Sequence, residues 1–188
     1  MEGNFLSEGD KIQGTGKTIL DYWKWAHSVI LDNTERGVFA EFLVGSALDV
    51  LNSPRVMWDN ADINYNGYFI EVKSSAYIQS WEQSKPSTPM FGIAPKRNWT
   101  GIGNEYETDL RRFAQYYIFC LLNEKNRDKV DPLNINQWEF YILPTKVLNH
   151  HNKTQKTISL RPLQYLSSRI TYHEIKPSLD NLIDKFND

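Results

Sequence analysis

The stretch 62-DINYNGYFIEVKSSA-76 holds an Asn-Gly pair between two runs in which apolar and polar residues alternate. This pattern is the strongest short-range signal of a β-hairpin, because a two-residue type I′ turn needs positive φ at both central positions. The sequence therefore predicts a hairpin that turns at Asn66 and Gly67. Counting outward from this turn places Asp62 opposite Glu71.

The two faces of this hairpin differ in chemistry, because side chains alternate along a strand. One face is apolar and carries Ile63, Tyr65, Tyr68, Ile70 and Val72. The other face is largely polar and carries Asp62, Asn64, Phe69, Glu71 and Lys73. Like charges directly opposite on a sheet are destabilising, so the acids Asp62 and Glu71 need a cation between them. Lys73 supplies one cation, and a metal ion would supply another.

Length and composition predict one soluble domain. The chain has 188 residues, of which 40% are hydrophobic and 23% charged, and a core of ordinary size fits this length. We expect a flexible N-terminal arm over 1–17 and a single domain over 18–188. No run approaches the roughly 20 apolar residues of a membrane span, and the N-terminus lacks a signal-peptide pattern. These features predict a cytoplasmic protein without a membrane partner.

Charge and cysteine content exclude several classes. Cys120 is the single cysteine, so a disulfide framework and cysteine-based zinc or iron–sulfur sites cannot form within one chain. The net charge is −2, from 21 basic and 23 acidic residues. This balance argues against indiscriminate nucleic-acid binding but leaves a local basic patch open.

The remaining pattern predicts an α/β fold with a central mixed β-sheet flanked by helices. Apolar periodicity, caps and turn residues predict helices over 19–31, 35–51, 76–83, 145–151 and 178–187. Thr18 is the expected cap of the first of these, an amphipathic packing helix, and Asn33 or Thr34 that of the second, a buried helix. β-Branched and aromatic residues predict further strands over 90–94, 113–122, 137–143 and 169–175.

Glu41 is an unusual residue in the second predicted helix. Helical spacing places it on a narrow stripe with Val38, Gly45 and Leu48, where an unpaired carboxylate costs several kcal/mol or changes its pKa. Glu41 therefore needs a partner, which is a catalytic metal ion or water in one interpretation. In the other interpretation, a structural ion pair with Arg36 or Lys73 satisfies it.

The order of a helical glutamate, an aspartate, a turn and then Glu-x-Lys resembles the PD-(D/E)XK nucleases, the restriction-endonuclease-like superfamily. Asp62 matches the signature aspartate, Glu71 the second acid, Lys73 the lysine and Glu41 the helical acid that many members carry. Ala61 stands where the motif has proline. Wider phrases over residues 20–160, among them RGVFAEFLVGSALD, IEVKSSAYIQSWEQ, FGIAPK and QWEFYILPT, are similar to an uncharacterised bacterial branch of nuclease-like proteins.

The resemblance implies a restriction-endonuclease-like core and a Mg²⁺ site, for which Mn²⁺ would substitute. Asp62, Glu71, the Val72 carbonyl and Glu41 would be the metal ligands, because carboxylate and carbonyl oxygens suit Mg²⁺. Lys73 would orient or deprotonate the attacking water or stabilise the transition state. Ser75 and Gln79 are minor candidates for contact with phosphate or water, and a polar helix start explains them equally well.

Basic and aromatic residues outside this signature are candidates for contact with DNA. The basic residues are Lys85, Lys96, Arg97, Arg111 and Arg112, which would meet phosphates. Trp81 or Trp99 would pack against a sugar or a base. A solvated charged surface is the alternative explanation for all of them.

Two functions follow from these residues. The first is a Mg²⁺-dependent endonuclease that hydrolyses DNA phosphodiester bonds, in restriction, phage defence or repair. The second is a catalytically inactive nuclease-like fold that binds nucleic acid or a partner protein. Both leave RNA as a substrate and a homodimer open.

Overall fold

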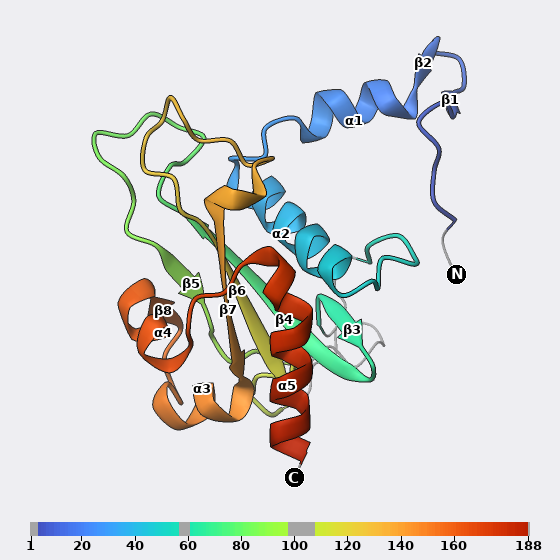
Figure 1. Ribbon diagram of the computed structural model, residues 1–188. Coiled ribbons are helices and arrows are strands. Elements are labelled where there is room, and N and C mark those ends of the chain that lie inside the picture. Colours follow the sequence, from blue (N-terminus) through green and yellow to red (C-terminus); the bar gives the residue numbers. More distant parts are fainter. Residues whose placement is uncertain (1–3, 57–60, 98–107, 188) are drawn as a thin grey trace.

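The structure, a computed structural model, describes residues 4–56, 61–97 and 108–187. Its centre is a four-stranded sheet in the order β3-β4-β6-β7. The strands are β3 (Ile63–Tyr65), β4 (Tyr68–Ala76), β6 (Tyr116–Leu122) and β7 (Trp138–Pro144). β4 and β6 are parallel and the outer pairs are antiparallel, which confirms the predicted α/β fold with a mixed central sheet flanked by helices (Figure 1).

The predicted hairpin is confirmed in turn and register. Asn66 has φ 52° and Gly67 has φ 86°, the two positive angles that the Asn-Gly pair predicts. β3 pairs with β4 so that Ile63 lies opposite Ile70. The polar side chains of the hairpin therefore share the face expected from the sequence.

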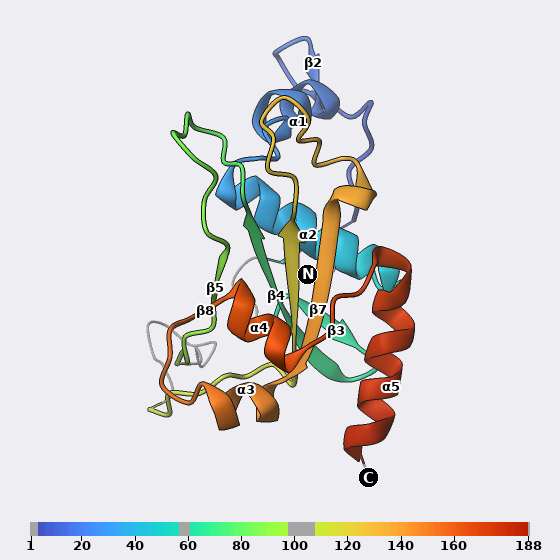
Figure 2. The same ribbon diagram turned by 60° about the vertical axis from the view of Figure 1, so that its left-hand side comes forward.

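Helices and a small ribbon cover the two faces of the sheet. α2 (Asn33–Ala47) and α5 (Ile175–Asn187) pack on one face. The opposite face is covered by α3 (Thr145–His151), α4 (Leu160–Leu166) and the antiparallel ribbon of β5 (Met90–Gly92) and β8 (Thr157–Ser159). Figure 2 shows the sheet between these two layers.

β4 carries charged residues on the face of the sheet that α3, α4 and the β5–β8 ribbon cover. Every residue of the central strand β6 is buried, as expected for a strand covered on both faces. In β4, Ile70 and Val72 pack into the core under α2 and α5. Glu71 and Lys73 alternate with them and point to the other face, so the central sheet itself positions these two charges.

The N-terminal region contains a ladder that the sequence does not predict and a helix that differs from its prediction. The expected arm contains a short ladder of β1 (Lys11–Ile12) and β2 (Lys17–Thr18). Thr18 caps α1 (Ile19–His27) through a capping box with Asp21, as predicted, but the helix ends four residues early. α1 buries no residue and extends away from the sheet (Figure 1). The prediction of a packing helix is therefore wrong, because amphipathic spacing identifies an apolar face without identifying what covers it.

Two other predicted elements are wrong. Residues 77–83 form bends in place of a helix, and β4 runs on to Ala76. Residues 169–175 hold one isolated bridge, between Phe140 and Ile170, followed by the 3₁₀ helix η2 (Tyr172–Glu174) that leads into α5. The strands β5, β6 and β7 and the helix α3 are confirmed within a few residues.

The cap of α2 and three short elements also differ from the predictions. The cap of α2 is Asp32, one residue before the first of the predicted caps, and it accepts a hydrogen bond from the Thr34 N–H at 2.9 Å. α2 therefore begins two residues before the predicted start. Three short elements were not predicted: β8, α4 and the 3₁₀ helix η1 (Ile135–Gln137). No helix in the described part of the chain is long and apolar enough to span a membrane.

We predict opposite effects for two Gly→Ala substitutions. Gly67→Ala should lower the free energy of unfolding by about 1 kcal/mol, because an L-residue resists positive φ. Gly37→Ala is the matched control, since a Cβ at this position in α2 meets nothing within 4 Å. It should raise the free energy of unfolding by about 0.5 to 1 kcal/mol through helix propensity. Urea denaturation measures both, and equal effects would contradict the assigned turn.

Candidate functional site

Glu71 is the centre of a charged cluster on the sheet. Its side chain is 7% exposed, and Lys73 donates to its Oε1 at 2.7 Å. Lys96 approaches from the segment after β5 and donates to Oε1 at 3.2 Å and to Oε2 at 3.1 Å. One buried carboxylate is therefore held by two ammonium groups.

These contacts determine the charge of Glu71. Burial alone would raise its pKa, but the ammonium groups of Lys73 and Lys96 outweigh burial and hold the pKa of Glu71 below its ordinary value. Glu71 is therefore ionised at neutral pH. One ionised carboxylate and two cations are therefore concentrated at a largely buried point of the sheet.

Asp62 lies beside Glu71 at the start of the hairpin. Its backbone N–H donates to the Ile70 carbonyl at 3.1 Å, and its Oδ2 accepts from the Val72 N–H at 2.7 Å. Burial, and then the negative charge of Glu71, raise the pKa of Asp62 to about 6, although Lys73 and the Val72 N–H act in the opposite direction. The repulsion between the two acids that the hairpin predicted is therefore present in the fold.

Glu41 has a partner that the sequence analysis missed. Arg55 donates from Nη2 to Glu41 Oε1 at 2.8 Å and from Nε to Oε2. The hydrogen bond with Glu41 raises the pKa of Arg55, and the charge of Asp62 adds to this. The predicted structural partners, Arg36 and Lys73, bond elsewhere. A usable signal existed, because Arg55 is the only basic residue between Glu41 and Asp62 in the chain.

Glu41 also belongs to the electrostatic environment of the site. Its negative charge contributes to the raised pKa of Asp62. Arg55 is therefore near two carboxylates that would otherwise repel each other. Three acids and three cations, from α2, the segment before β3, β4 and the segment after β5, make up this cluster.

Tyr117 is a further neighbour that the sequence analysis missed. It lies on β6 directly opposite Glu71 in the parallel register and is buried. Burial, followed by the negative charge of Glu71, raises the pKa of its hydroxyl. The predicted strand over 113–122 contained Tyr117, but only its register with β4 reveals its place beside the cluster.

The two minor candidates make contacts that support the fold. Ser75 is buried and its Oγ accepts from the Met90 N–H at 3.2 Å. Gln79 is buried, donates to the Ala76 carbonyl at 2.8 Å and accepts from Arg36 at 3.2 Å. These bonds tie β4 to neighbouring segments, and contact with phosphate or water stays a prediction for both residues.

Four of the basic candidates for contact with DNA lie outside the core: Lys96, Arg111, Arg97 and Lys85. Lys96 binds Glu71, and its backbone pairs with that of Arg111 at 2.9 and 3.1 Å. The Arg111 guanidinium lies 4.7 Å from the centroid of the Phe113 ring. Arg97 is exposed next to Lys96, and Lys85 is exposed in the segment that leaves β4 at its C-terminal end. Their contact with DNA stays a prediction.

Arg112 differs from the other basic candidates because its guanidinium is buried. It donates to the carbonyls of Ile93, Asn152 and Gln155 and to Asn149 Oδ1, at 2.6 to 3.1 Å. These bonds join the segment after β5 to the end of α3. They give Arg112 a structural role, and its contact with phosphate stays a prediction. Trp81 is 52% exposed, whereas Trp99 lies outside the described residues.

The donor set fits a small divalent cation. Among residues 4–56, 61–97 and 108–187, no three His, Cys, Asp or Glu side chains form a group that could together hold a metal ion. Asp62 and Glu71 are two carboxylates close enough to perturb one another. Mg²⁺ often binds proteins through only one or two carboxylates and keeps several waters, so two neighbouring carboxylates are compatible with its chemistry.

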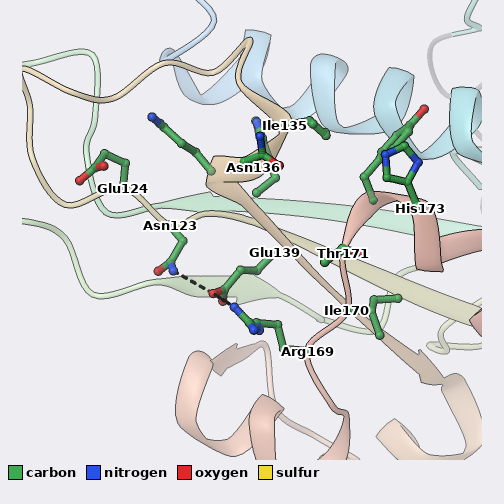
Figure 3. Close-up of a pocket in the computed structure, with 12 residues that line it drawn as sticks. Asn123, Glu124, Ile135, Asn136, Glu139, Arg169, Ile170, Thr171 and His173 are labelled. Carbon is green, nitrogen blue, oxygen red and sulfur yellow. Dashed lines mark hydrogen bonds and ion pairs between the residues drawn. The ribbon is translucent and has the colours of Figure 1, made fainter.

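A separate pocket lies away from the cluster. It has a volume of about 290 Å³ and lies at the start of β7 and before α5 (Figure 3). Its polar groups bond to one another, because Asn123 and Arg169 donate to Glu139 Oε1 at 2.8 and 3.3 Å. None of the predicted site residues lines this pocket.

The fold and the cluster define an α/β protein with an acid–lysine site on its central sheet, a class that includes nucleases. The family model described as Bacteriophage T4 endonuclease IV matches residues 6–162. The chain belongs to this family, and the match covers nearly the same part of the sequence as the predicted resemblance. No curated protein and no solved structure matches the chain.

We predict that Asp62→Asn stabilises the metal-free protein in a pH-dependent way. The pKa of Asp62 rises from 3.8 to about 6 on folding, so the native state binds the proton more tightly and loses stability as pH rises through this range. The cost above about pH 6 is on the order of 3 kcal/mol. Asparagine removes this cost and can still accept from the Val72 N–H.

Thermal unfolding in EDTA measures this effect. Asp62→Asn should raise the melting temperature near pH 8 and have little effect near pH 4. Glu71→Gln is the control with the opposite sign, because it leaves Lys73 and Lys96 without their shared carboxylate. A lower melting temperature for Asp62→Asn near pH 8 would contradict the assigned repulsion.

Proposed function

We propose that this chain is a divalent-metal-dependent endonuclease that hydrolyses DNA phosphodiester bonds. The observation that carries the proposal is the Asp62–Glu71 pair with Lys73 on the same strand face as Glu71. Membership in a family named for an endonuclease supports it. The likeness of the acid–acid–lysine order to the PD-(D/E)XK superfamily is part of the proposal, as is a role in restriction, phage defence or repair.

Asp62 and Glu71 are the proposed ligands of Mg²⁺ or Mn²⁺, with the Val72 carbonyl as a further ligand. When bound, the ion lowers the pKa of a coordinated water and neutralises charge on the phosphate. Glu71 is held ionised for this purpose by its lysine neighbours. The hydrogen bond from the Val72 N–H orients the Asp62 carboxylate toward β4.

Lys73 and Glu41 have supporting roles in this proposal. Lys73 keeps its ammonium beside Glu71 at 2.7 Å with 30% of its side chain exposed, so it can orient the attacking water by donating to it or stabilise charge on the phosphate. To deprotonate the water, Lys73 must first lose its own proton. Glu41 would hold an outer water or a second ion. That role requires Arg55 to release one of the two Glu41 oxygens.

The alternative is a catalytically inactive fold that binds nucleic acid or a partner protein. The raised pKa of Asp62 supports the enzyme, because a carboxylate whose pKa rises on folding is expected to lower the stability of the fold near neutral pH. A protein that only binds would gain stability from asparagine at this position. Sites that carry such a cost are typical of catalysis.

We predict that the parent cleaves DNA only with a divalent metal and that Asp62→Ala, Glu71→Ala and Lys73→Ala each reduce the rate by about a hundredfold or more. Each variant removes a proposed ligand or a charge at the phosphate. The assay uses supercoiled, linear, branched and single-stranded DNA, with RNA in parallel, in Mg²⁺, Mn²⁺ or EDTA.

The matched controls are Asp128→Ala and Lys129→Ala, which remove one acid and one lysine from an exposed segment between β6 and β7. Both should cleave at the parent rate. A Lys73→Ala variant that folds and cuts every substrate as fast as the parent would disprove the proposed mechanism. Absence of cleavage by the parent on all substrates would favour the binding-only alternative.

We also predict that metal stabilises the parent more than Asp62→Asn. A bound ion stabilises the native state by about 2.7 kcal/mol at a hundredfold excess over its Kd. The variant lacks one carboxylate ligand and should gain much less. Thermal unfolding with Mg²⁺ or Mn²⁺, compared with EDTA, measures both shifts. Equal metal-induced shifts in the two proteins would remove Asp62 from the ligand set.

A further inference from the structure

Lys96 has a fixed backbone and an accessible side chain. Its N–H donates to the Arg111 carbonyl at 2.9 Å, and its carbonyl accepts from the Arg111 N–H at 3.1 Å. Its side chain is 44% exposed, whereas the Glu71 side chain that it contacts is 7% exposed. Lys96 therefore reaches from the surface into the buried centre of the cluster.

The ammonium of Lys96 contacts both oxygens of the Glu71 carboxylate. It lies 3.2 Å from Glu71 Oε1 and 3.1 Å from Oε2. Lys73 contacts only Oε1, at 2.7 Å. A cation that approaches both oxygens of Glu71 must compete with Lys96 more directly than with Lys73.

The two lysines also differ in their freedom to move. Lys73 lies two residues from Glu71 on β4, within the hydrogen-bonded ladder with β6. Lys96 lies outside the strands, where one isolated bridge with Arg111 holds its backbone. A lysine stem is flexible and an ammonium is readily hydrated, so the half-exposed Lys96 can leave Glu71 at lower cost.

We propose that Lys96 is a positioning residue with two successive partners. In the metal-free protein it neutralises Glu71, and when a divalent cation binds Glu71 it turns to a phosphate of the bound nucleic acid. This inference rests on the proposed function. The charge of Lys96 alone predicts contact with phosphate whether or not metal is bound. In this inference, Lys96 contacts phosphate only when a metal ion is bound to Glu71.

If Lys96 exchanges Glu71 for a phosphate, its substitution should change the affinities for a divalent cation and for DNA in opposite directions. Lys96→Met keeps most of the side-chain length but removes the competing charge, so the affinity for a divalent cation should rise. The same variant loses a phosphate contact, so the affinity for DNA should fall. A lysine that only supports the fold would weaken both affinities or change neither.

The first measurement is titration of Mn²⁺ into the protein by calorimetry. The Kd of Lys96→Met should be about two- to fivefold below that of the parent, the effect expected for loss of an ion pair at a partly exposed site. Lys129→Met is the control and should leave the Kd unchanged. An unchanged or higher Kd for Lys96→Met, or no Mn²⁺ binding by the parent, would overturn the inference.

The second measurement is the salt dependence of binding to a labelled DNA duplex by fluorescence anisotropy. With Ca²⁺ in place of Mg²⁺, Lys96→Met should reduce the slope of log Kd against log salt by about 0.9, the value for one phosphate contact. In EDTA the slopes of parent and variant should agree, because Lys96 is then engaged with Glu71. Equal slopes in Ca²⁺, or the same reduction in EDTA, would overturn the inference.

Lys96→Arg keeps the test decisive if the methionine variant does not fold. A guanidinium matches the two oxygens of a carboxylate in bidentate fashion, so it should hold Glu71 more tightly and raise the Kd for Mn²⁺. An unchanged Kd would contradict the exchange of partners by Lys96.

The outcomes separate this inference from the proposed function. If the parent shows these metal and salt effects without cleaving DNA, the nuclease proposal fails alone. If the parent cleaves DNA but Lys96→Met binds Mn²⁺ like the parent, the exchange fails alone.

Discussion

The ion-pair cluster around the buried Glu71 carboxylate is the constraint on which the site depends. A carboxylate that is 7% exposed needs cations beside it, because an unpaired buried charge is costly. Lys73 supplies one from the same strand and Lys96 supplies another from the segment after β5. The contact with Lys96 links the central sheet to that segment, which the Arg111 bridge and the buried Arg112 guanidinium also hold.

The same cluster contains an opposing interaction that lowers stability. Burial, and then the negative charges of Glu71 and Glu41, raise the pKa of Asp62. The fold compensates in part, through the Val72 N–H and through Arg55, which bonds to Glu41. The remaining cost is the physical reason to assign a function to these residues, because hydrophobic or neutral side chains would serve the fold better.

Local structure was predictable where short-range interactions decide it. The Asn-Gly turn, the strands β6 and β7 and the helix α3 were predicted within a few residues, because turn chemistry and apolar runs act within one element. Errors occurred where longer-range contacts decide. The residues after Ala76 are irregular, and the segment before α5 forms a single bridge with β7. The apolar stripe of α1 predicted burial, but the helix lies away from the sheet.

The sequence by itself determined the hairpin, the face shared by Asp62, Glu71 and Lys73, and the need for a cation between the two acids, because alternation and turn geometry relate residues that are close in the chain. Only the tertiary structure decided which groups complete the site. Lys96 meets Glu71 across 25 residues, Arg55 meets Glu41 across 14, and the other predicted partners of Glu41 bond elsewhere. Periodicity identifies a face, whereas packing of elements distant in the chain determines which charges meet on it.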